Sequence, residues 1–225
     1  MLDIGSGAGD VAVLAADLVG PSGEVVGSDP AAVTVGTARA RAKCLPNVSF
    51  REGDPADMEF EKPFGAIIGR YVLQFMPDPA AALRKLVRYL RPGGVVVFHE
   101  LDWDGARSAP PVPTYDRCCR WIAQTFQQSG AETNMGVRLH SVFVAADLPS
   151  PKMQLRAVIG AGSDCLEAVQ LVTDLVGRLV PAMERLGVAT ALEVDHASLA
   201  DRIMTEARPG STIVGRAEVG AWSRV

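Results

Sequence analysis

The chain has 225 residues and a formal net charge of −4 at pH 7, with 48% hydrophobic and 21% charged residues. A chain of this length can bury the core of one large domain. Its acidic balance without clustered Lys and Arg, and the lack of any apolar run near the roughly 20 residues that span a bilayer, argue against nucleic acid or a membrane as its partner.

Over the first 100 residues, short β-prone runs alternate with longer amphipathic stretches. The predicted strands lie at about 1–4, 24–28, 47–51, 64–68 and 94–100. The predicted helices lie near 10–19, 31–44 and 79–90, each followed by glycine or proline, which stop a helix. The alternation predicts an α/β fold, with a mostly parallel sheet and helices on both faces.

After residue 100 the rhythm changes, because the prolines within 109–113 cannot continue a strand or lie inside a helix. The remaining predicted elements are helices at 114–128 and 136–147, a strand at 152–162, helices at about 164–186 and 195–207, and a last strand at 211–225. We expect a single domain over 1–225, with 1–100 as its cofactor-binding half and helical, substrate-side insertions at about 101–147 and 164–207.

The most specific motif is Asp3-x-Gly5-x-Gly7-x-Gly9, at the first predicted turn from strand to helix. Glycines let a ligand approach the backbone closely, and the start of the next helix offers unpaired N–H groups. A dinucleotide-binding turn needs a further glycine where this chain has Asp10, whose charge would repel a pyrophosphate. The turn therefore indicates another ligand, and the plainer interpretation is a glycine turn that binds nothing.

This pattern resembles the first motif of the class I S-adenosylmethionine-dependent methyltransferases of the small-molecule type, a Rossmann-like family. S-adenosylmethionine carries a sulfonium and an ammonium group, which an acid at a strand end suits. The resemblance implies a doubly wound sheet of order 3-2-1-4-5-7-6, with an antiparallel last strand and helical insertions after strand five and before strand seven. It also implies methyl transfer with S-adenosylhomocysteine as the product. Family members usually carry helices before the first strand, so the resemblance implies that this N-terminal lid is missing.

Two further segments match the family. The stretch VVGSD at 25–29 ends the second predicted strand with Asp29, where an acid can accept hydrogen bonds from a ribose diol. The stretch GDPADM at 53–58 resembles the family segment that meets the adenine edge, which implies roles for Asp54 and Pro55. A solvated strand end and a plain turn are the simpler interpretations of these two segments.

The longest match covers residues 64–102, from the fourth predicted strand into the fifth. Within it, Asp78 is expected to cap a helix that begins with Pro79, which requires no chemical role. Arg70 and Tyr71 follow a strand end that borders the ligand crevice in such sheets. The cofactor-binding residues that the resemblance implies are Asp3, Gly5, Ser6, Gly7, Gly9, Asp29, Pro30, Asp54, Pro55, Arg70 and Tyr71.

Methyl transfer requires little catalytic chemistry, because alignment alone can lower the barrier by roughly 7 to 11 kcal/mol. The candidate catalytic residues are His99 and Glu100, at the end of the fifth predicted strand. Successive strand residues face opposite sides, so at most one of this pair can face a given pocket. His140 and His196 are expected to be ordinary histidines, and no metal is predicted because no cluster of His, Cys, Asp and Glu has metal spacing.

Aromatic residues on or beside the first insertion suggest where the substrate binds. Trp103, Tyr115 and Trp121 suit an apolar or planar small molecule, and Phe75 after the fourth strand is the candidate opposite wall. The alternative is that the aromatics of the insertion pack its helices onto the sheet. We expect a small-molecule acceptor with an O, N or C nucleophile, since the few basic residues argue against nucleic acid.

Two other functions stay open at this point. A non-methylating or inactive cofactor-binding member would share the fold, because a fold does not determine function. An NAD(P)-dependent oxidoreductase is less favoured, because the last glycine of the dinucleotide fingerprint and a Tyr-x-x-x-Lys pair are missing. Four cysteines without CxxC spacing indicate reduced thiols and a cytoplasmic location. The oligomeric state is unknown, with a homodimer as one option.

Overall fold

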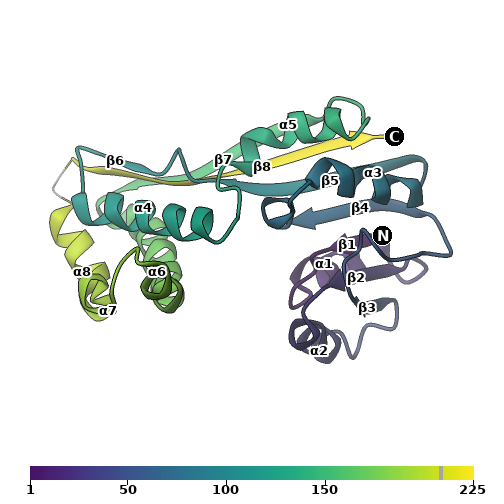
Figure 1. Cartoon of the computed structure of the whole chain (residues 1–225), viewed down its shortest axis with the longest axis horizontal. Coiled ribbons are helices and arrows are strands. Elements are labelled where there is room, and N and C mark those ends of the chain that lie inside the picture. The colour runs from purple at the N-terminus through teal and green to yellow at the C-terminus, as the bar shows by residue number, and fades with distance from the viewer. Residues whose placement is uncertain (208–209) are drawn as a thin grey trace. The chain divides into compact units, whose positions relative to one another are not determined.

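The computed structural model describes residues 1–207 and 210–225, and Figure 1 shows the course of the chain. Its strands are β1 (Leu2–Ile4), β2 (Val25–Asp29), β3 (Val48–Glu52), β4 (Phe64–Arg70), β5 (Leu90–Asp102), β6 (Arg107–Ala109), β7 (Lys152–Ala161) and β8 (Thr212–Arg224). Its helices are α1 (Asp10–Val19), α2 (Ala32–Arg41), α3 (Pro79–Leu86), α4 (Pro113–Gln128), α5 (Met135–Ala145), α6 (Leu166–Leu186), α7 (Ala191–Val194) and α8 (His196–Glu206). Short 3₁₀ turns occupy Leu73–Phe75, Val87–Tyr89 and Gly162–Cys165. Every helix and strand predicted from the sequence has a counterpart.

The chain divides into two compact units, each built from separated segments. The first unit consists of Met1–Glu100, Val137–Gln154 and Gly220–Val225, and the second of Leu101–Gly136 and Leu155–Val219. The boundary after Glu100 falls where the rhythm of the sequence changes. The expectation of one domain over the whole chain stays a prediction.

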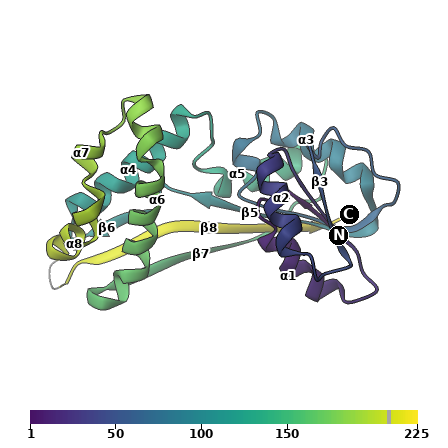
Figure 2. The ribbon, with the colours of Figure 1, turned by 90° about the horizontal axis from the view of Figure 1, so that it is seen from below.

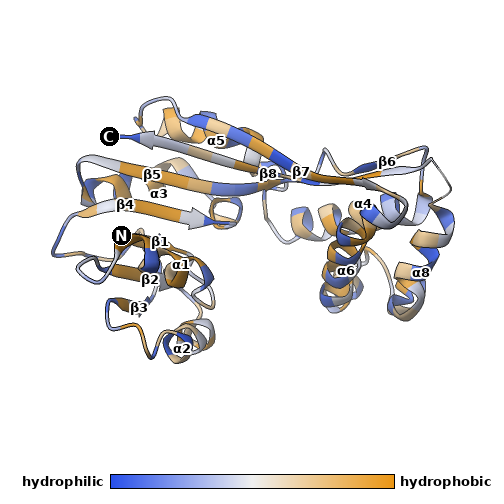
Figure 3. Ribbon diagram, turned by 180° about the vertical axis from the view of Figure 1, so that it is seen from behind, coloured by the Kyte–Doolittle hydropathy of each residue, from blue (hydrophilic) through white to orange (hydrophobic). Residues whose placement is uncertain are grey.

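The sheet has the order β3-β2-β1-β4-β5-β8-β6, with β7 paired to β8. β1 runs parallel to both β2 and β4, with Leu2 opposite Val26 on one side and Ile67 on the other. Figure 3 shows the arrow of β8 pointing against that of β4. The predicted α/β sheet is therefore confirmed, including a last strand that runs against the first ones. The short strand β6 was not predicted, because its three residues precede a proline-rich stretch and pair only with β8.

In the first unit, α1 and α2 pack on β2 and β3, and Figure 2 shows α2 in front of the strands of this unit. Ala12 and Ala15 of α1 and Ala38 of α2 are buried there together with Phe50 of β3. Small side chains let a helix approach a sheet closely. The first turn of α1 is thereby held beside the carboxyl ends of the strands.

The carboxyl ends of β1, β2 and β4 meet at one edge of this parallel sheet, where ligands bind in folds of this kind. Figure 3 shows β4 hydrophobic along most of its length and hydrophilic at its tip, where Arg70 ends the strand. The strand is thus apolar within the core and polar at its carboxyl end, which is the edge where ligands bind in such sheets.

The largest difference between predicted and observed element ends lies between α3 and β5. The helix predicted at 79–90 ends at Leu86, and the 3₁₀ turn Val87–Tyr89 leads directly into β5 at Leu90. The predicted turn at 91–94 lies inside β5, where the register with β4 shifts between Phe64 and Ala66. Glycines within a strand are typical of such irregularities.

In the second unit, α4, α6 and α8 pack on one another. Their fully buried side chains include Ile122 of α4, Val176 of α6 and Ile203 of α8. Buried residues at helical spacing on each helix explain this core. Within the described residues, no helix has both the length and the apolar composition that crossing a bilayer requires.

Candidate functional site

The glycine turn after β1 has the backbone geometry that its sequence predicts. Gly5, Gly7 and Gly9 all adopt positive φ, at 62°, 52° and 86°. A Cβ at Gly5 would lie 2.5 Å from Cγ2 of Val72, so this position must be glycine for packing as well as for conformation. A Cβ at Gly7 would meet nothing within 4 Å. The turn is therefore closely packed at Gly5 and open at Gly7, where a ligand can approach the backbone.

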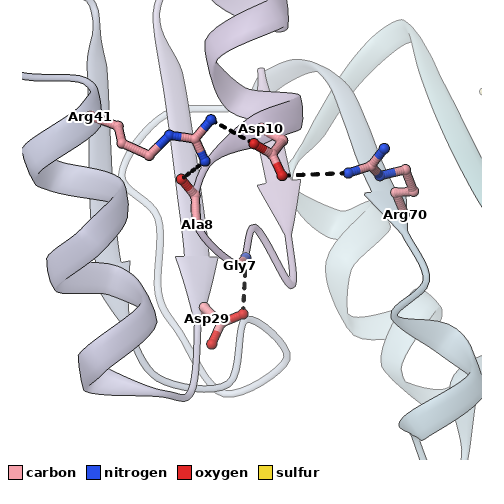
Figure 4. Close-up of polar contacts among 6 residues, drawn as sticks. All are labelled: Gly7, Ala8, Asp10, Asp29, Arg41 and Arg70. Atoms are coloured by element: carbon pink, nitrogen blue, oxygen red, sulfur yellow. Dashed lines mark hydrogen bonds and ion pairs between the residues drawn. The ribbon is translucent and has the colours of Figure 1, made fainter. Parts of the chain in front are cut away.

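Asp29, at the end of β2, holds the middle of this turn. Its Oδ2 accepts a hydrogen bond from the Gly7 N–H at 3.0 Å, and its Oδ1 accepts one from Ala31 N–H at 2.9 Å. Figure 4 shows the contact with Gly7. Because a carboxylate oxygen has two lone pairs, each oxygen can accept one more hydrogen bond. The position suits the predicted contact with a ribose diol.

Asp3 lies on β1, beneath the turn, and is only 1% exposed. Burial raises the pKa of its carboxyl group to about 7, although the Ala12 amide and the Arg70 charge favour ionisation. Its Oδ2 has no hydrogen-bond partner in the part of the chain that the structure describes. A buried carboxyl group of this kind attracts a cation, since a nearby positive charge would offset the cost of ionisation.

An ion-pair network that sequence reasoning missed flanks the same turn (Figure 4). Asp10, in the first turn of α1, lies 2.6 Å from Nη2 of Arg41 and 3.8 Å from Nη2 of Arg70. Arg41 also donates from Nη1 to the carbonyl oxygen of Ala8 at 2.9 Å. These side chains are about half exposed, so each pair adds little stability, at most about 1 kcal/mol. Their effect is local, because two guanidinium groups are held next to the glycine turn.

The turn after β4 begins with Tyr71, which adopts a positive φ of 57°. Its N–H donates to the carbonyl oxygen of His99 at 2.9 Å, and its ring centroid lies 5.4 Å from that of His99. The guanidinium of Arg70 lies over the Tyr71 ring at 5.3 Å. A left-handed conformation costs a non-glycine residue roughly 1–2 kcal/mol, so these contacts must fix the tyrosine.

His99 and Glu100 at the end of β5 face opposite sides, as the strand period predicts. His99 is partly exposed, whereas Glu100 is fully buried. Oε1 of Glu100 accepts hydrogen bonds from the N–H groups of Val72 at 2.9 Å and Leu73 at 2.8 Å. Burial raises the pKa of Glu100 to about 7, against the opposing effect of these amides. The side chain of Glu100 presents no surface to a substrate here, and the catalytic roles of both residues stay predictions.

The turn after β3 is joined to the end of β2 by a backbone hydrogen bond. The N–H of Gly53 donates to the carbonyl oxygen of Asp29 at 3.0 Å, and Oδ1 of Asp54 accepts from the Ala56 N–H at 2.8 Å. Pro55 is buried. The carboxylate of Asp54 is thus used within its own turn, and its predicted contact with an adenine edge is untested.

Pro30 and Ser6 also belong to the predicted cofactor-binding residues. Pro30 follows Asp29 and is exposed. Ser6 is buried, and its N–H donates to the carbonyl oxygen of Ser28 at 2.8 Å, which joins the glycine turn to β2. Ser6 thus shapes the turn through its backbone.

The predicted substrate residues fall in different surroundings. Phe75 belongs to the first unit and is 54% exposed. In the second unit, Tyr115 is fully buried and donates from its hydroxyl to the carbonyl oxygen of Val214 at 3.1 Å, which supports the core-packing alternative for this residue. Trp103 is 5% exposed, and Trp121 is partly exposed. Their contact with a substrate stays a prediction.

The histidines outside β5 have ordinary contacts. Nε2 of His140 lies 3.1 Å from Oγ of Ser150, and Nε2 of His196 lies 3.1 Å from the carbonyl oxygen of Thr173. Over residues 1–207 and 210–225, no group of three or more His, Cys, Asp or Glu residues could hold a metal ion.

Comparison with known proteins gives this geometry a context. Residues 1–138 match the model of a protein family described as a methyltransferase domain. The arsenite methyltransferase of Aquipseudomonas alcaligenes is 36% identical over 111 residues, which cover 45% of this chain and 32% of that protein. The 2-phytyl-1,4-naphtoquinone methyltransferase of Synechococcus elongatus is 28% identical over 187 residues, which cover 80% of this chain and 77% of that protein. The chain spans less than half the length of several relatives that it matches.

A solved structure shares the fold. The geranyl diphosphate C-methyltransferase of Streptomyces coelicolor, solved with Mg²⁺, geranyl diphosphate and S-adenosyl-L-homocysteine, has a TM-score of 0.56 and 18% sequence identity to this chain. The likeness covers 100% of this chain and 70% of the other. At this level of identity the likeness shows the fold alone.

Proposed function

The chain belongs to the methyltransferase domain family, and on that premise we propose that the protein transfers a methyl group from S-adenosylmethionine to a small molecule. The observation that carries the proposal is the glycine turn, open at Gly7 and bordered by the carboxyl groups of Asp3 and Asp29. S-adenosylmethionine combines a positive charge with a ribose and, unlike NAD, carries no pyrophosphate, which a glycine turn ending in Asp10 does not suit.

The residues at this edge fit that cofactor. The unpartnered Oδ2 of Asp3 is a site for a positive charge, and the Asp29 carboxylate retains lone pairs for two hydroxyl groups. Arg70, whose guanidinium is 41% exposed on the other side of the turn, suits the carboxylate of the amino-acid end. The charges of Asp3 and Arg70 thus complement the positive and negative charges of the cofactor's methionine part.

When bound, S-adenosylmethionine supplies a methyl carbon that an acceptor atom attacks as the carbon–sulfur bond breaks, leaving S-adenosylhomocysteine. The task of the chain is to align the acceptor with that carbon and to keep the cofactor fixed. An oxygen or carbon acceptor whose proton must leave also needs a base. His99, which is partly exposed and carries the ring that faces Tyr71, is the candidate base.

The class of acceptor rests on the relatives. Those described above are named for arsenite, a naphthoquinone and geranyl diphosphate, which are all small molecules. We propose a small-molecule acceptor for this chain too, with the exposed Phe75 of the first unit as the candidate contact. The cytoplasmic location stays a prediction, and a homodimer stays one option for the oligomeric state.

The test has two stages. Calorimetric titration of the purified protein with S-adenosylhomocysteine and with NAD should show saturable binding of the first alone. Radiolabelled S-adenosylmethionine is then incubated with a panel of arsenite, naphthoquinols, prenyl diphosphates, phenols and amines, and label should move to at least one of them. Binding without any transfer would favour the non-methylating alternative, and binding of NAD alone would overturn the proposal.

A further inference from the structure

Two hydrogen bonds and one packing contact connect the end of β5 to the glycine turn after β1. Glu100 holds the N–H groups of Val72 and Leu73 through one oxygen. The side chain of Val72 in turn fills the space beside Gly5, where a Cβ would lie 2.5 Å from its Cγ2. The carboxyl group of Glu100 on β5 is therefore linked, through Val72, to the glycine turn that follows β1.

The side chain of Val72 is confined from two sides. A Cβ at Gly69 of β4 would lie 2.8 Å from Cγ1 of Val72, and one at Gly5 would lie still closer to Cγ2. Both distances are shorter than real contacts, so the two glycines leave room for this valine and for little else. A small displacement of the Val72 backbone would push its side chain into Gly5 or withdraw it. The side chain of Val72 thus packs tightly between the glycine turn and β4.

Only one of the two carboxyl oxygens of Glu100 has a hydrogen-bond partner among the described residues. Glu100 is fully buried, and its Oε2 has no hydrogen-bond partner among the residues that the structure describes. A buried polar oxygen without a partner costs free energy, while the other oxygen of Glu100 satisfies two N–H groups that an apolar side chain would leave without an acceptor. Residues that break such a rule at a ligand-binding edge commonly serve function.

We propose, on the basis of the function proposed above, that Glu100 is a positioning residue for cofactor binding. It fixes the amides of Val72 and Leu73, keeps the Val72 side chain against Gly5, and so holds the glycine turn in the shape that admits the cofactor. It touches neither the cofactor nor the acceptor, and it acts through Val72.

The first test compares Glu100→Gln with Glu100→Leu. The amide oxygen of Gln can still accept from both N–H groups, so S-adenosylhomocysteine should bind Glu100→Gln within about threefold of wild type. Leu removes the acceptor, and the dissociation constant should rise about tenfold or more. Titrations are made well below the melting temperature of each variant, with folding checked by circular dichroism.

A matched control separates positioning from general destabilisation. Glu206 also accepts from a backbone N–H, that of Thr114 at 2.8 Å, but it lies in the second unit. Glu206→Leu should lower the melting temperature while leaving the dissociation constant within about threefold of wild type. The proposal is overturned if Glu100→Leu binds as wild type does, or if Glu206→Leu loses as much affinity as Glu100→Leu.

A second measurement needs neither the cofactor nor a folded Leu variant. Backbone amide resonances of the wild type and Glu100→Gln are followed by NMR between pH 5 and pH 9. The Val72 and Leu73 resonances should shift as Glu100 ionises, and the Gly5 resonance should shift in the same step, which Glu100→Gln should lack. His99 of the same strand and the amides of Val72, Leu73 and Gln74 are the groups that act on this carboxyl. His99→Gln should therefore retain the step.

If Gly5 stays unmoved while Val72 and Leu73 shift, the connection to the glycine turn is refuted. Should the wild type bind no S-adenosylhomocysteine, the proposed function fails by itself. The Gly5 shift would still decide whether Glu100 positions the turn.

Discussion

The carboxylate of Asp29 accepts hydrogen bonds from the N–H groups of Gly7 and Ala31. Its removal would therefore disturb the glycine turn as well as remove the predicted contact with the ribose. We expect Asp29→Ala to weaken S-adenosylhomocysteine binding by about 1.5–3 kcal/mol, the cost of losing hydrogen bonds to a charged group. Isothermal titration calorimetry measures the change. Asp147→Ala is the control, because the Asp147 side chain is 87% exposed. An unchanged dissociation constant in Asp29→Ala would refute the ribose role.

Asp3 should make cofactor binding depend on pH. Burial raises the pKa of its carboxyl group to about 7, and a cation bound beside it favours the ionised form. Binding therefore releases a proton, and the affinity for S-adenosylmethionine should rise as the pH increases from about 6 to about 8. Asp3→Asn should bind more weakly at pH 8 and lose this dependence on pH. Equal slopes in both proteins would show that Asp3 does not face the cation.

The sequence allowed the acids of the site to be predicted better than their partners. Asp3 and Asp29 were predictable because the ends of parallel strands meet at one edge. The pair of Asp10 and Arg41 was missed, since the two residues are far apart in sequence and neither belongs to a periodic pattern. Strand alternation predicted that His99 and Glu100 face opposite sides, but it could not tell which one is buried.

Among the elements, α3 carries the clearest boundary signal. Oδ1 of Asp78 accepts from the Ala81 N–H at 2.8 Å, and Pro79 begins the helix, as predicted. Asp78→Ala should lower the free energy of unfolding by about 0.5–2 kcal/mol, the usual value of an N-cap. Urea denaturation measures this loss, and Asp78→Ser should restore most of it. A Ser variant as unstable as the Ala variant would mean that the cap is not the cause.

The ends of elements were predictable where a side chain signals them and not where the partner strand decides. The Asp-Pro pair placed the start of α3 correctly. Its end was misplaced because β5 begins at Leu90, through a shift in register with β4 that depends on tertiary pairing. Strand β6 was missed for the same reason, since its three residues are defined by their pairing with β8.

For the whole molecule, the two buried carboxyl groups predict how stability varies with pH. Burial raises the pKa of Asp3 from 3.8 and that of Glu100 from 4.5, each to about 7. Between about pH 4 and pH 7, the native state therefore retains protons on Asp3 and Glu100 that the unfolded chain has already lost. Their contribution to stability is therefore complete below about pH 4 and is lost as the pH rises through about 7.

Urea denaturation at pH 5 and pH 8 tests this expectation. The wild type should lose more free energy of unfolding between the two values than Asp3→Asn or Glu100→Gln, because each variant removes one titrating group. Each pKa unit corresponds to about 1.4 kcal/mol. Asp147→Asn, which changes an exposed group, should match the wild type. Parallel losses in all four proteins would contradict the prediction.

At this scale the sequence predicted the class of fold and, through the family resemblance, the order of the first five strands. It also predicted that an insertion begins after residue 100, which is where the second unit starts. It did not predict that α5, placed in the first insertion, falls mainly in the first unit. Local patterns report helices and strands. Which of them share a core is decided by contacts between distant parts of the chain.

The contact between Gly5 and Val72 also has an evolutionary consequence. Because a Cβ at position 5 would overlap Cγ2 of Val72, a lineage that gains a side chain at one position must lose volume at the other. Positions 5 and 72 should therefore vary together among related sequences, and the two turns should be inherited as a matched pair.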